Sequence, residues 1–453
     1  MVMEPVATAG KTRIPDVVGA DLLVPLVDGR LVSPAQLDHA ASAPCLTAVQ
    51  EGVNALLPWY SSVHRGSGFT SQVTTGAYER ARAAVRGFVG AGPDACVLFT
   101  RHTTDALNLL ARALPPGTTV FRFSADHHAA LLPWRGAGIR RLGLPAGPDD
   151  ALRRLGSALA GAPGGPRLVV LTGVSNVTGE VWPVAELAEV ARRHGARVVL
   201  DAAQLAPHRP LDATALGVDW VALSGHKLYA PFGAGALVGA ADWLAAAEPY
   251  LAGGGATARV AQEAGREAVT WADLPHRHEA GSPNVVGAHA LAVACDTLAA
   301  DWDAITGHER ALAGRLRRGL AAIPGVRLLG MWDPEHPRIG VVSFTVADRT
   351  GAPADQELIA TALAAEHGIG VRYGAFCAHQ AVHHLVGGAD GSGRALRASV
   401  GLGTTAEHVE RFLAALAGLV RGGPRWSYRR SAEGWVPDPD PRPRPEFLRR
   451  TLP

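Results

Sequence analysis

The sequence predicts an α/β fold built on a mostly parallel sheet that is covered by helices. Three apolar runs, at residues 168–171, 198–200 and 218–223, each have the length and composition of a buried strand. Residues 183–194 are expected to form a helix, with a proline near its first position and a glycine directly after its end. This alternation of strand and helix is typical of a parallel sheet with helices on both faces.

Polar side chains follow two of these expected strands at the point where each strand ends. Asp201 ends the run 198–200, and Ser224-Gly225-His226-Lys227 follows the run 218–223. In open α/β sheets, ligands bind beyond the carboxyl ends of the strands. We therefore expect Asp201 and Lys227 to face one binding site.

Lys227 is unusual in this chain because the only other lysine is Lys11, and arginine supplies nearly every other cationic side chain. An amine can lose its proton and form a Schiff base with an aldehyde, whereas a guanidinium cannot. The alternative is an ordinary surface lysine after a strand. The scarcity of lysine and the position of Lys227 favour a reactive amine.

The composition excludes several classes of protein. With 453 residues, 47% of them hydrophobic and 19% charged, the chain is expected to be a soluble globular protein of two domains. Its net charge of +2 gives no reason to expect nucleic acid or an anionic membrane as a partner. Neither a signal peptide nor a run of membrane-spanning length is found, so a cytoplasmic location is expected.

The four cysteines are too few and too scattered for a disulfide framework or a CxxC metal site. Cys96 and Cys295 lie in apolar patterns and are expected to be inert core residues. His127 and His128 are adjacent, but neighbouring residues on one loop rarely point the same way and no third ligand is in view. No metal site is therefore expected.

Local sequence leaves two functions open for Thr103 and Thr104. They precede an expected helix at 106–114, where they could bind an anion or simply cap the helix.

Two other segments are expected to be loops. The Gly-rich segment 59–68, WYSSVHRGSG, has the composition of a surface loop, and residues 253–277 are expected to form a long loop.

Two motifs together resemble the aminotransferase class V family of pyridoxal-phosphate enzymes. They are DAAQ at residues 201–204 and SGHKLYAPFGAG at residues 224–235. The resemblance spans about residues 36–421 and is to the group II cysteine desulfurases and selenocysteine lyases within the family. It implies the fold-type I architecture, with a large domain on a mostly parallel sheet of the seven-stranded type and a smaller α+β C-terminal domain. It also implies pyridoxal 5′-phosphate as cofactor.

The resemblance implies roles for individual residues. Lys227 would carry the cofactor, Asp201 would keep its ring nitrogen protonated and His127 would stack on the ring. The other implied cofactor ligands are Thr103, Thr104, Asn176, Gln204, Ser224 and His226, with Ser282 reaching the phosphate in the partner's site of a homodimer. The implied substrate-binding residues are Asn176, Arg397, Arg372, His64 and Arg65. One departure is His102, where the family usually has glycine.

Cys377 distinguishes between functions within this family. It follows Arg372 by five positions, a short spacing similar to that of group II desulfurases. A loop thiolate near cationic groups is a competent nucleophile. The alternative is an incidental small residue in an aminotransferase-like loop, and two departures bear on it: Gln380 stands where the family often has proline, and a Gly-rich stretch, 386–393, follows.

The resulting hypothesis is a cysteine desulfurase that converts L-cysteine to L-alanine with a persulfide on Cys377, and that also acts as a selenocysteine lyase. A sulfur-acceptor protein would then be a partner. The alternative is a class V aminotransferase or a C–S lyase acting on another amino acid or a cysteine conjugate, in which Cys377 accepts no sulfur. An inactive scaffold is disfavoured because Lys227, Asp201 and His127 are all present.

Four parts of the chain are expected. They are an N-terminal arm (1–35), a large cofactor-binding domain (36–301), a small C-terminal domain (302–421) and a Pro/Arg-rich tail (422–453). The tail has the composition of a linker, although Trp426, Tyr428 and Trp435 argue that part of it packs on the body.

Overall fold

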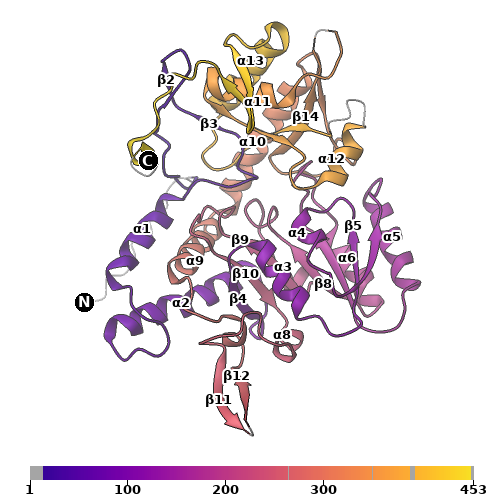
Figure 1. Ribbon diagram of the computed structural model, residues 1–453. Helices are drawn as coiled ribbons and strands as arrows, with labels where there is room; N and C mark the ends of the chain where they lie inside the picture. Colours follow the sequence, from indigo (N-terminus) through magenta and orange to yellow (C-terminus); the bar gives the residue numbers. More distant parts are fainter. Residues whose placement is uncertain (1–13, 264, 349, 388–392, 450–453) are drawn as a thin grey trace.

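The computed structural model describes residues 14–449 except 264, 349 and 388–392. The chain forms two lobes (Figure 1), and the larger lobe contains a seven-stranded sheet. Across the sheet, the strands are β4 (Cys96–Thr100), β10 (Gly235–Gly239), β9 (Trp220–Ser224), β8 (Arg197–Asp201), β7 (Arg167–Thr172), β5 (Thr119–Phe123) and β6 (Gly138–Leu142). Only β10 runs antiparallel to its neighbours, which confirms the predicted mostly parallel sheet.

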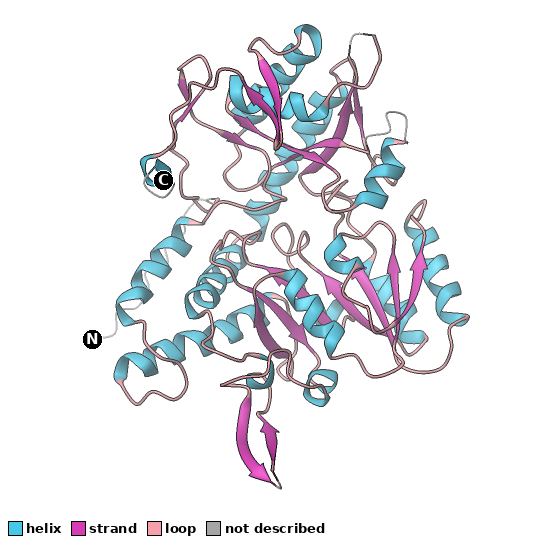
Figure 2. Ribbon diagram, in the orientation of Figure 1, coloured by secondary structure: helices cyan, strands magenta, loops and turns pink. Residues whose placement is uncertain are grey.

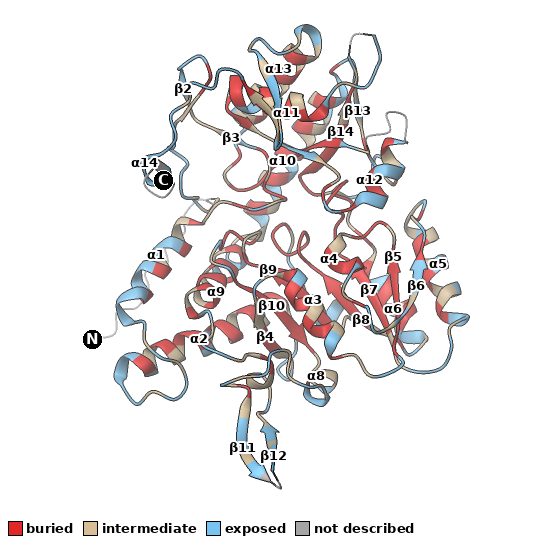
Figure 3. Cartoon of the chain, in the orientation of Figure 1, coloured by how far each residue is buried: buried red, intermediate tan, exposed pale blue. Residues whose placement is uncertain are grey.

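Helices cover both faces of this sheet (Figure 2), and the alternation of side chains along the strands explains why. Val198 and Leu200 of β8 pack on one face, against α5 (Pro148–Ala160), α6 (Val184–Arg193) and α9 (Val285–Ala299). Val199 packs on the other face, against α3 (Thr103–Arg112) and α4 (His128–Leu131). Burial on both faces (Figure 3) accounts for the continuous apolar runs in the sequence.

The smaller lobe contains a four-stranded antiparallel sheet in the order β13 (Val326–Leu328), β14 (Val341–Val346), β17 (Ala395–Ser399) and β16 (Arg372–Gly374). Its core is shared with α10 (Trp302–Ala321), α11 (Gln356–His367) and α13 (Ala406–Gly422). The short helix α12 (His379–Val386) follows β16. This is the predicted α+β lobe.

The segment around Leu37 passes between the two lobes. Just before it, β3 (Ala35–Gln36) pairs in parallel with β15 (Ile369–Gly370) of the small lobe. Just after it, the amide of Ala40 donates to Ser399 Oγ (2.9 Å), and the amide of Ala43 donates to the carbonyl of His226 (2.9 Å). Both lobes therefore determine where Asp38 lies.

Other helices and strands lie outside the two main sheets. They are β1 (Val24–Pro25), β2 (Leu31–Val32), α1 (Thr47–Leu56), η1 (Leu57–Trp59), α2 (Phe69–Phe88), α7 (Ala213–Leu216), α8 (Asp242–Ala246), η2 (His276–His278) and α14 (Glu446–Arg449). No helix within the described ranges combines the length and the apolar character needed to cross a membrane.

One local expectation was wrong. The segment 253–277 contains an antiparallel hairpin, β11 (Thr257–Glu263) with β12 (Arg266–Trp271), which projects from the large lobe (Figure 1). Side chains on both of its faces are largely exposed, so the sequence lacks the apolar alternation that marks a half-buried strand.

The helix expected at 183–194 is confirmed as α6, which begins at Val184 because Pro183 is its N-cap.

The C-terminal tail packs against the small lobe through a second hairpin, β18 (Tyr428–Ser431) with β19 (Gly434–Pro437). The buried carboxylate of Glu366 on α11 accepts hydrogen bonds from the amides of Arg425 and Trp426 and from Tyr428 Oη. Three donors from the tail thus converge on one carboxylate.

We expect Glu366→Ala to destabilise this attachment by about 1–3 kcal/mol, because partly buried donors lose their acceptor. Limited proteolysis should cut the tail faster in this variant, and the midpoint of urea unfolding should fall. Glu189→Ala on the exposed face of α6 is the control, since exposed ion pairs contribute little. Equal proteolysis of both variants would show that Glu366 does not hold the tail.

Candidate active site

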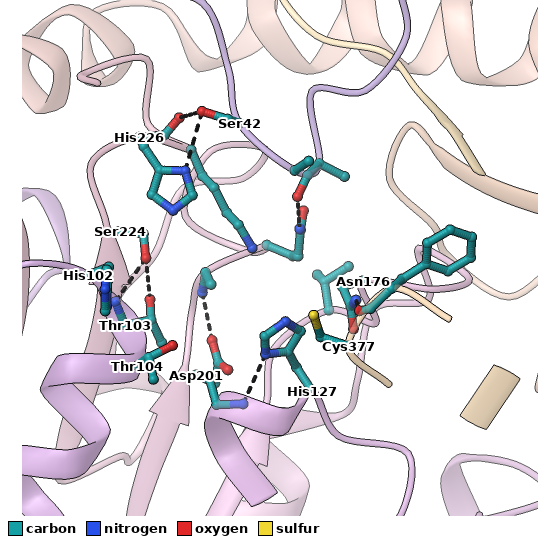
Figure 4. A pocket seen from close by; sticks show the side chains of 18 of the residues that line it. Ser42, His102, Thr103, Thr104, His127, Asn176, Asp201, Ser224, His226 and Cys377 are labelled. Atoms are coloured by element: carbon teal, nitrogen blue, oxygen red, sulfur yellow. Dashed lines mark hydrogen bonds between the residues drawn. The ribbon is translucent and has the colours of Figure 1, made fainter. Parts of the chain in front are cut away.

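A cavity of about 370 Å³ lies at the carboxyl ends of β7, β8 and β9 (Figure 4). Twelve of the residues singled out from the sequence line it: Thr103, Thr104, His127, Asn176, Asp201, Gln204, Ser224, His226, Lys227, Arg372, Cys377 and Arg397. Three others do not line it: Ser282, His64 and Arg65 lie together at a separate cavity of about 500 Å³.

Lys227 enters the cavity from the turn after β9. Gly225 makes this turn possible, since a Cβ there would lie 2.5 Å from the carbonyl oxygen of Ala234. Among the described residues, the amine forms no hydrogen bond and no ion pair. Burial lowers the pKa of Lys227 to about 8, against an opposing attraction to Asp201. A substantial fraction of this amine is therefore neutral near physiological pH.

Asp201 is the last residue of β8 and is buried. Its Oδ1 accepts a hydrogen bond from the amide of Ala203 (3.0 Å). Burial raises the pKa of Asp201, and both that hydrogen bond and the charge of Lys227 act in the opposite direction. Because burial disfavours an unpaired charge, a protonated nitrogen in the cavity would stabilise this carboxylate as its charge partner.

Hydroxyl groups and the first turn of α3 form one side of the cavity (Figure 4). Ser224 Oγ lies 2.8 Å from Thr103 Oγ1 and accepts from the amide of Thr103 (2.8 Å). The N-cap of α3 is His102, whose Nδ1 accepts from the amide of Asp105 (3.2 Å), so capping by a threonine was wrong. The hydroxyls of Thr103 and Ser224 thus bond to each other at the cavity wall, and hydroxyls beside a helix N-terminus suit an anion.

Two imidazoles at the cavity are neutral. Burial lowers the pKa of His127 to about 3 and that of His226 to about 4, and in each case Lys227 adds a smaller contribution. His127 Nδ1 accepts from the amide of Ala129 (3.0 Å), which leaves its proton on Nε2. His226 Nδ1 lies 3.4 Å from Ser42 Oγ.

A pair of arginines approaches the cavity from the small lobe. Arg397 is 2% exposed and Arg372 is exposed, and both form ion pairs with Asp38, at 3.1 and 3.2 Å. Arg397 Nη1 also donates to the carbonyl oxygen of Asn176 (2.9 Å), whereas its buried Nε has no partner among the described residues. Such a guanidinium pair can bind a carboxylate.

Asp38 was not assigned a role from the sequence. Its two arginine partners are far away in the chain, and no local pattern indicates them. The one available signal was the run of small residues, Ala40 to Ser42, that follows His39 and also lines the cavity.

Gln204 joins the cavity to the segment between the lobes. Its Nε2 donates to the carbonyl oxygen of Ala40 (2.7 Å), and its buried Oε1 has no partner within the described parts of the chain. A buried polar atom without a partner is costly, so this atom favours a ligand that can bond to it.

Cys377 lies on a strained loop between β16 and α12. Phe376 and Cys377 have consecutive positive φ angles of 52° and 54°, which are uncommon for residues other than glycine. Neighbouring contacts hold this conformation: Asn176 Nδ2 donates to the carbonyl of Phe376 (2.8 Å), and the amide of His128 donates to the carbonyl of Cys377 (2.8 Å). Cys377 is exposed, and residues 388–392 of the Gly-rich stretch lie outside the described residues.

The remaining cysteines differ from Cys377 in burial. Cys295 is buried, and burial raises the pKa of its thiol as well as those of Cys45 and Cys96, the last to about 11. Thiols with raised pKa values are poor nucleophiles at neutral pH. Of the four, only Cys377 lines the cavity with Lys227.

The chain is similar over most of its length to known proteins of one family. Residues 35–412 match the family model "Aminotransferase class-V". A cysteine desulfurase of Dickeya dadantii is 36% identical over 399 residues, covering 84% of this chain and 91% of that protein. A probable cysteine desulfurase of Pseudomonas aeruginosa is 37% identical over 390 residues, covering 84% and 92%.

A solved structure of the cysteine desulfurase CsdA of Escherichia coli is similar to this fold, with a TM-score of 0.72 and 31% identity over 84% of this chain and 94% of that one. A cysteine desulfurase of Thermococcus onnurineus has a TM-score of 0.74 and 29% identity, covering 85% and 94%. Because the family model covers most of the sequence and several relatives exceed 30% identity over most of their length, this chain belongs to the aminotransferase class V family.

Proposed function

We propose that this protein is a pyridoxal-phosphate-dependent cysteine desulfurase, which converts L-cysteine to L-alanine and leaves the sulfur as a persulfide on Cys377. The observation that carries the proposal is the position of Cys377, an exposed thiol on a strained loop, in one cavity with Lys227 and the arginine pair. Relatives named as cysteine desulfurases support it. Assay of alanine and sulfide from free cysteine, with a reductant present, tests it.

The side chains of the cavity fit the cofactor. The neutral fraction of the Lys227 amine can attach its aldehyde, the Asp201 carboxylate can pair with its ring nitrogen, and the unpartnered Gln204 Oε1 can bond to it. Thr103, Thr104, Ser224 and His226 would hold its phosphate, and the neutral ring of His127 would stack on it. When bound, pyridoxal phosphate withdraws electrons from the substrate's α-carbon.

The protein's own groups would act in sequence on the substrate. Arg397, with Arg372, would grip the α-carboxylate, for which a guanidinium is well shaped. Lys227 Nζ would take the proton from the α-carbon. The Cys377 thiolate would then attack the substrate sulfur, forming an S–S bond as the carbon–sulfur bond breaks. The bonding electrons stay with the carbon skeleton, which would take up one proton at its β-carbon, regain a proton at its α-carbon from Lys227 and leave as alanine.

The rate of cofactor binding should depend on pH through Lys227. Only the neutral amine attacks the aldehyde, so the rate should rise with pH and level off above about 8. An amine with the ordinary pKa would give a rate still rising at pH 9.5. Absorbance changes after pyridoxal phosphate is mixed with cofactor-free protein measure this, and borohydride reduction followed by mass mapping should place the label on Lys227. A label on another residue would contradict the assignment.

The active unit is proposed to be a two-fold symmetric dimer. Large exposed apolar side chains follow α1, near the cavity that contains Ser282: Leu57, Trp59, Tyr60 and Phe69. Patches of this kind are typical of protein interfaces.

Wild-type protein should therefore sediment as a dimer, and Trp59→Glu with Phe69→Glu should shift it to monomers and lower activity. Leu448→Glu, at an exposed position near the C-terminus, is the matched control. A fully active wild-type monomer at assay concentration would refute the dimer and the role of Ser282 across it.

A further inference from the structure

Cys377 lies at the boundary between two cavities. A second cavity, of about 640 Å³, shares Thr104, His127, Ala129 and Cys377 with the one that contains Lys227. Its other walls come from α3 and from the segment that follows α4. The thiol can thus be reached from a side that neither Lys227 nor Arg397 lines.

The second cavity is cationic. Arg112 on α3 and Arg135 after α4 line it, and both are exposed. No carboxylate is among its described lining residues, and neither guanidinium forms an ion pair within the described part of the chain. Arg112 packs instead over the ring of Tyr250, 5.8 Å from the ring centre. Two such charges without a compensating carboxylate attract anions.

The wall that carries Cys377 is held in place on this side as well. The amide of His128 donates to the carbonyl of Cys377, and the ring of His128 packs edge-on against that of His379, with 4.5 Å between ring centres. His128 lines the second cavity. The backbone at Cys377 is therefore held by the segment 128–135, which also carries Arg135.

We propose that the second cavity binds the sulfur acceptor as a small anionic thiol, a thiol that carries a carboxylate, separately from the amino-acid substrate. This inference rests on the proposed function, since sulfur is available on Cys377 only after the first half-reaction. The amino acid that donates the sulfur then enters beside Lys227, and the thiol that accepts it enters beside Arg112 and Arg135.

The transfer itself requires no oxidant or reductant. The acceptor thiolate attacks the terminal sulfur of the Cys377 persulfide, forming a new S–S bond on the acceptor. The S–S bond to Cys377 breaks, and its electron pair leaves with the Cys377 sulfur as a thiolate. Arg112 and Arg135 take no part in bond making; they raise the local concentration of the anionic acceptor.

The test separates the two half-reactions. Cofactor-loaded protein receives one equivalent of cysteine, and alanine release together with the persulfide mass on Cys377 measures the first half. Either 3-mercaptopropionate, which is anionic, or 2-mercaptoethanol, which is neutral, is then added, and loss of the persulfide is followed by rapid quench and mass spectrometry. For each thiol, the wild-type rate is divided by the variant rate, so that the intrinsic reactivity of the thiol cancels.

The variant is Arg112→Gln with Arg135→Gln, and the control removes two exposed charges from α10, Arg310→Gln with Arg318→Gln. We expect the cavity variant to lose roughly tenfold in rate constant with 3-mercaptopropionate and less than twofold with 2-mercaptoethanol, because two exposed charge pairs contribute modestly. The first half-reaction should be unchanged, and added salt should reduce the difference.

Equal losses for the two thiols, or no loss with either, would overturn the proposal and make the second cavity only an entrance for solvent. A similar loss in the α10 control would overturn it too, since the effect would then reflect total charge. If wild type releases no alanine and forms no persulfide from cysteine, the proposed function itself fails and this inference falls with it.

Discussion

Replacing Cys377 by alanine should abolish alanine production from cysteine while leaving cofactor binding intact. Among the described residues, the thiol forms no hydrogen bond or ion pair with the groups assigned to the cofactor, so the absorbance of the bound cofactor and the labelling of Lys227 should match wild type. Turnover should fall on the order of 10³-fold or more, because no other thiol lines the cavity to receive the sulfur. The persulfide mass seen on wild type after brief exposure to cysteine should vanish.

Matched controls come from the other cysteines. Cys45→Ala, Cys96→Ala and Cys295→Ala each remove a thiol that lies outside the cavity and has its pKa raised by burial. Turnover should therefore persist in all three variants. Cys377→Ala that still makes alanine and sulfide at the wild-type rate would exclude desulfuration through a persulfide. Wild type that ignores cysteine but converts another amino acid or a thioether conjugate would favour the aminotransferase or C–S lyase hypothesis.

Asp201→Asn should bind the cofactor and yet lose most of its activity. The amide keeps the shape of the carboxyl group but no longer holds a proton on the ring nitrogen by charge. Loss of a buried charge-assisted contact costs about 2–4 kcal/mol of transition-state stabilisation, on the order of 10²–10³ in rate. Turnover measured at saturating cofactor tests this. Asp126 is the control position because it is buried nearby but does not line the cavity, and its carboxylate accepts from Thr172 Oγ1 (2.9 Å) and from the amide of Phe123 (3.0 Å).

Asp126→Asn should therefore leave the cofactor's absorbance spectrum unchanged, whereas Asp201→Asn should shift it. Near-normal turnover of Asp201→Asn, with the cofactor bound, would remove Asp201 from the proposed role.

The presence of the buried strands could be predicted from the sequence because the information is local. Apolar runs such as 198–200 are buried on both faces and thus read as strands without any knowledge of their neighbours. The polar residues that follow those runs must lie at the carboxyl ends of the sheet, so Asp201 and Lys227 could be placed in one site. Family motifs added most of the other lining residues.

Features that depend on distant partners could not be read in this way. Asp38 joins the site through arginines more than 300 positions away, and nothing in its own segment specifies them. The left-handed backbone at Phe376 and Cys377 is held by Asn176 and His128, which come from the other lobe. Neither phenylalanine nor cysteine favours a left-handed backbone, which is unfavourable by itself.

The sequence by itself determined the fold class, the strand-end placement of Asp201 and Lys227, and the identity of the reactive thiol candidate. Only the tertiary structure decided that Cys377 stands between two cavities and that His102, not a threonine, caps α3. The physical reason is the range of the interactions concerned. Strand burial follows from the pattern of adjacent residues, whereas cavities, ion pairs and strained loops arise where segments far apart in the chain pack together.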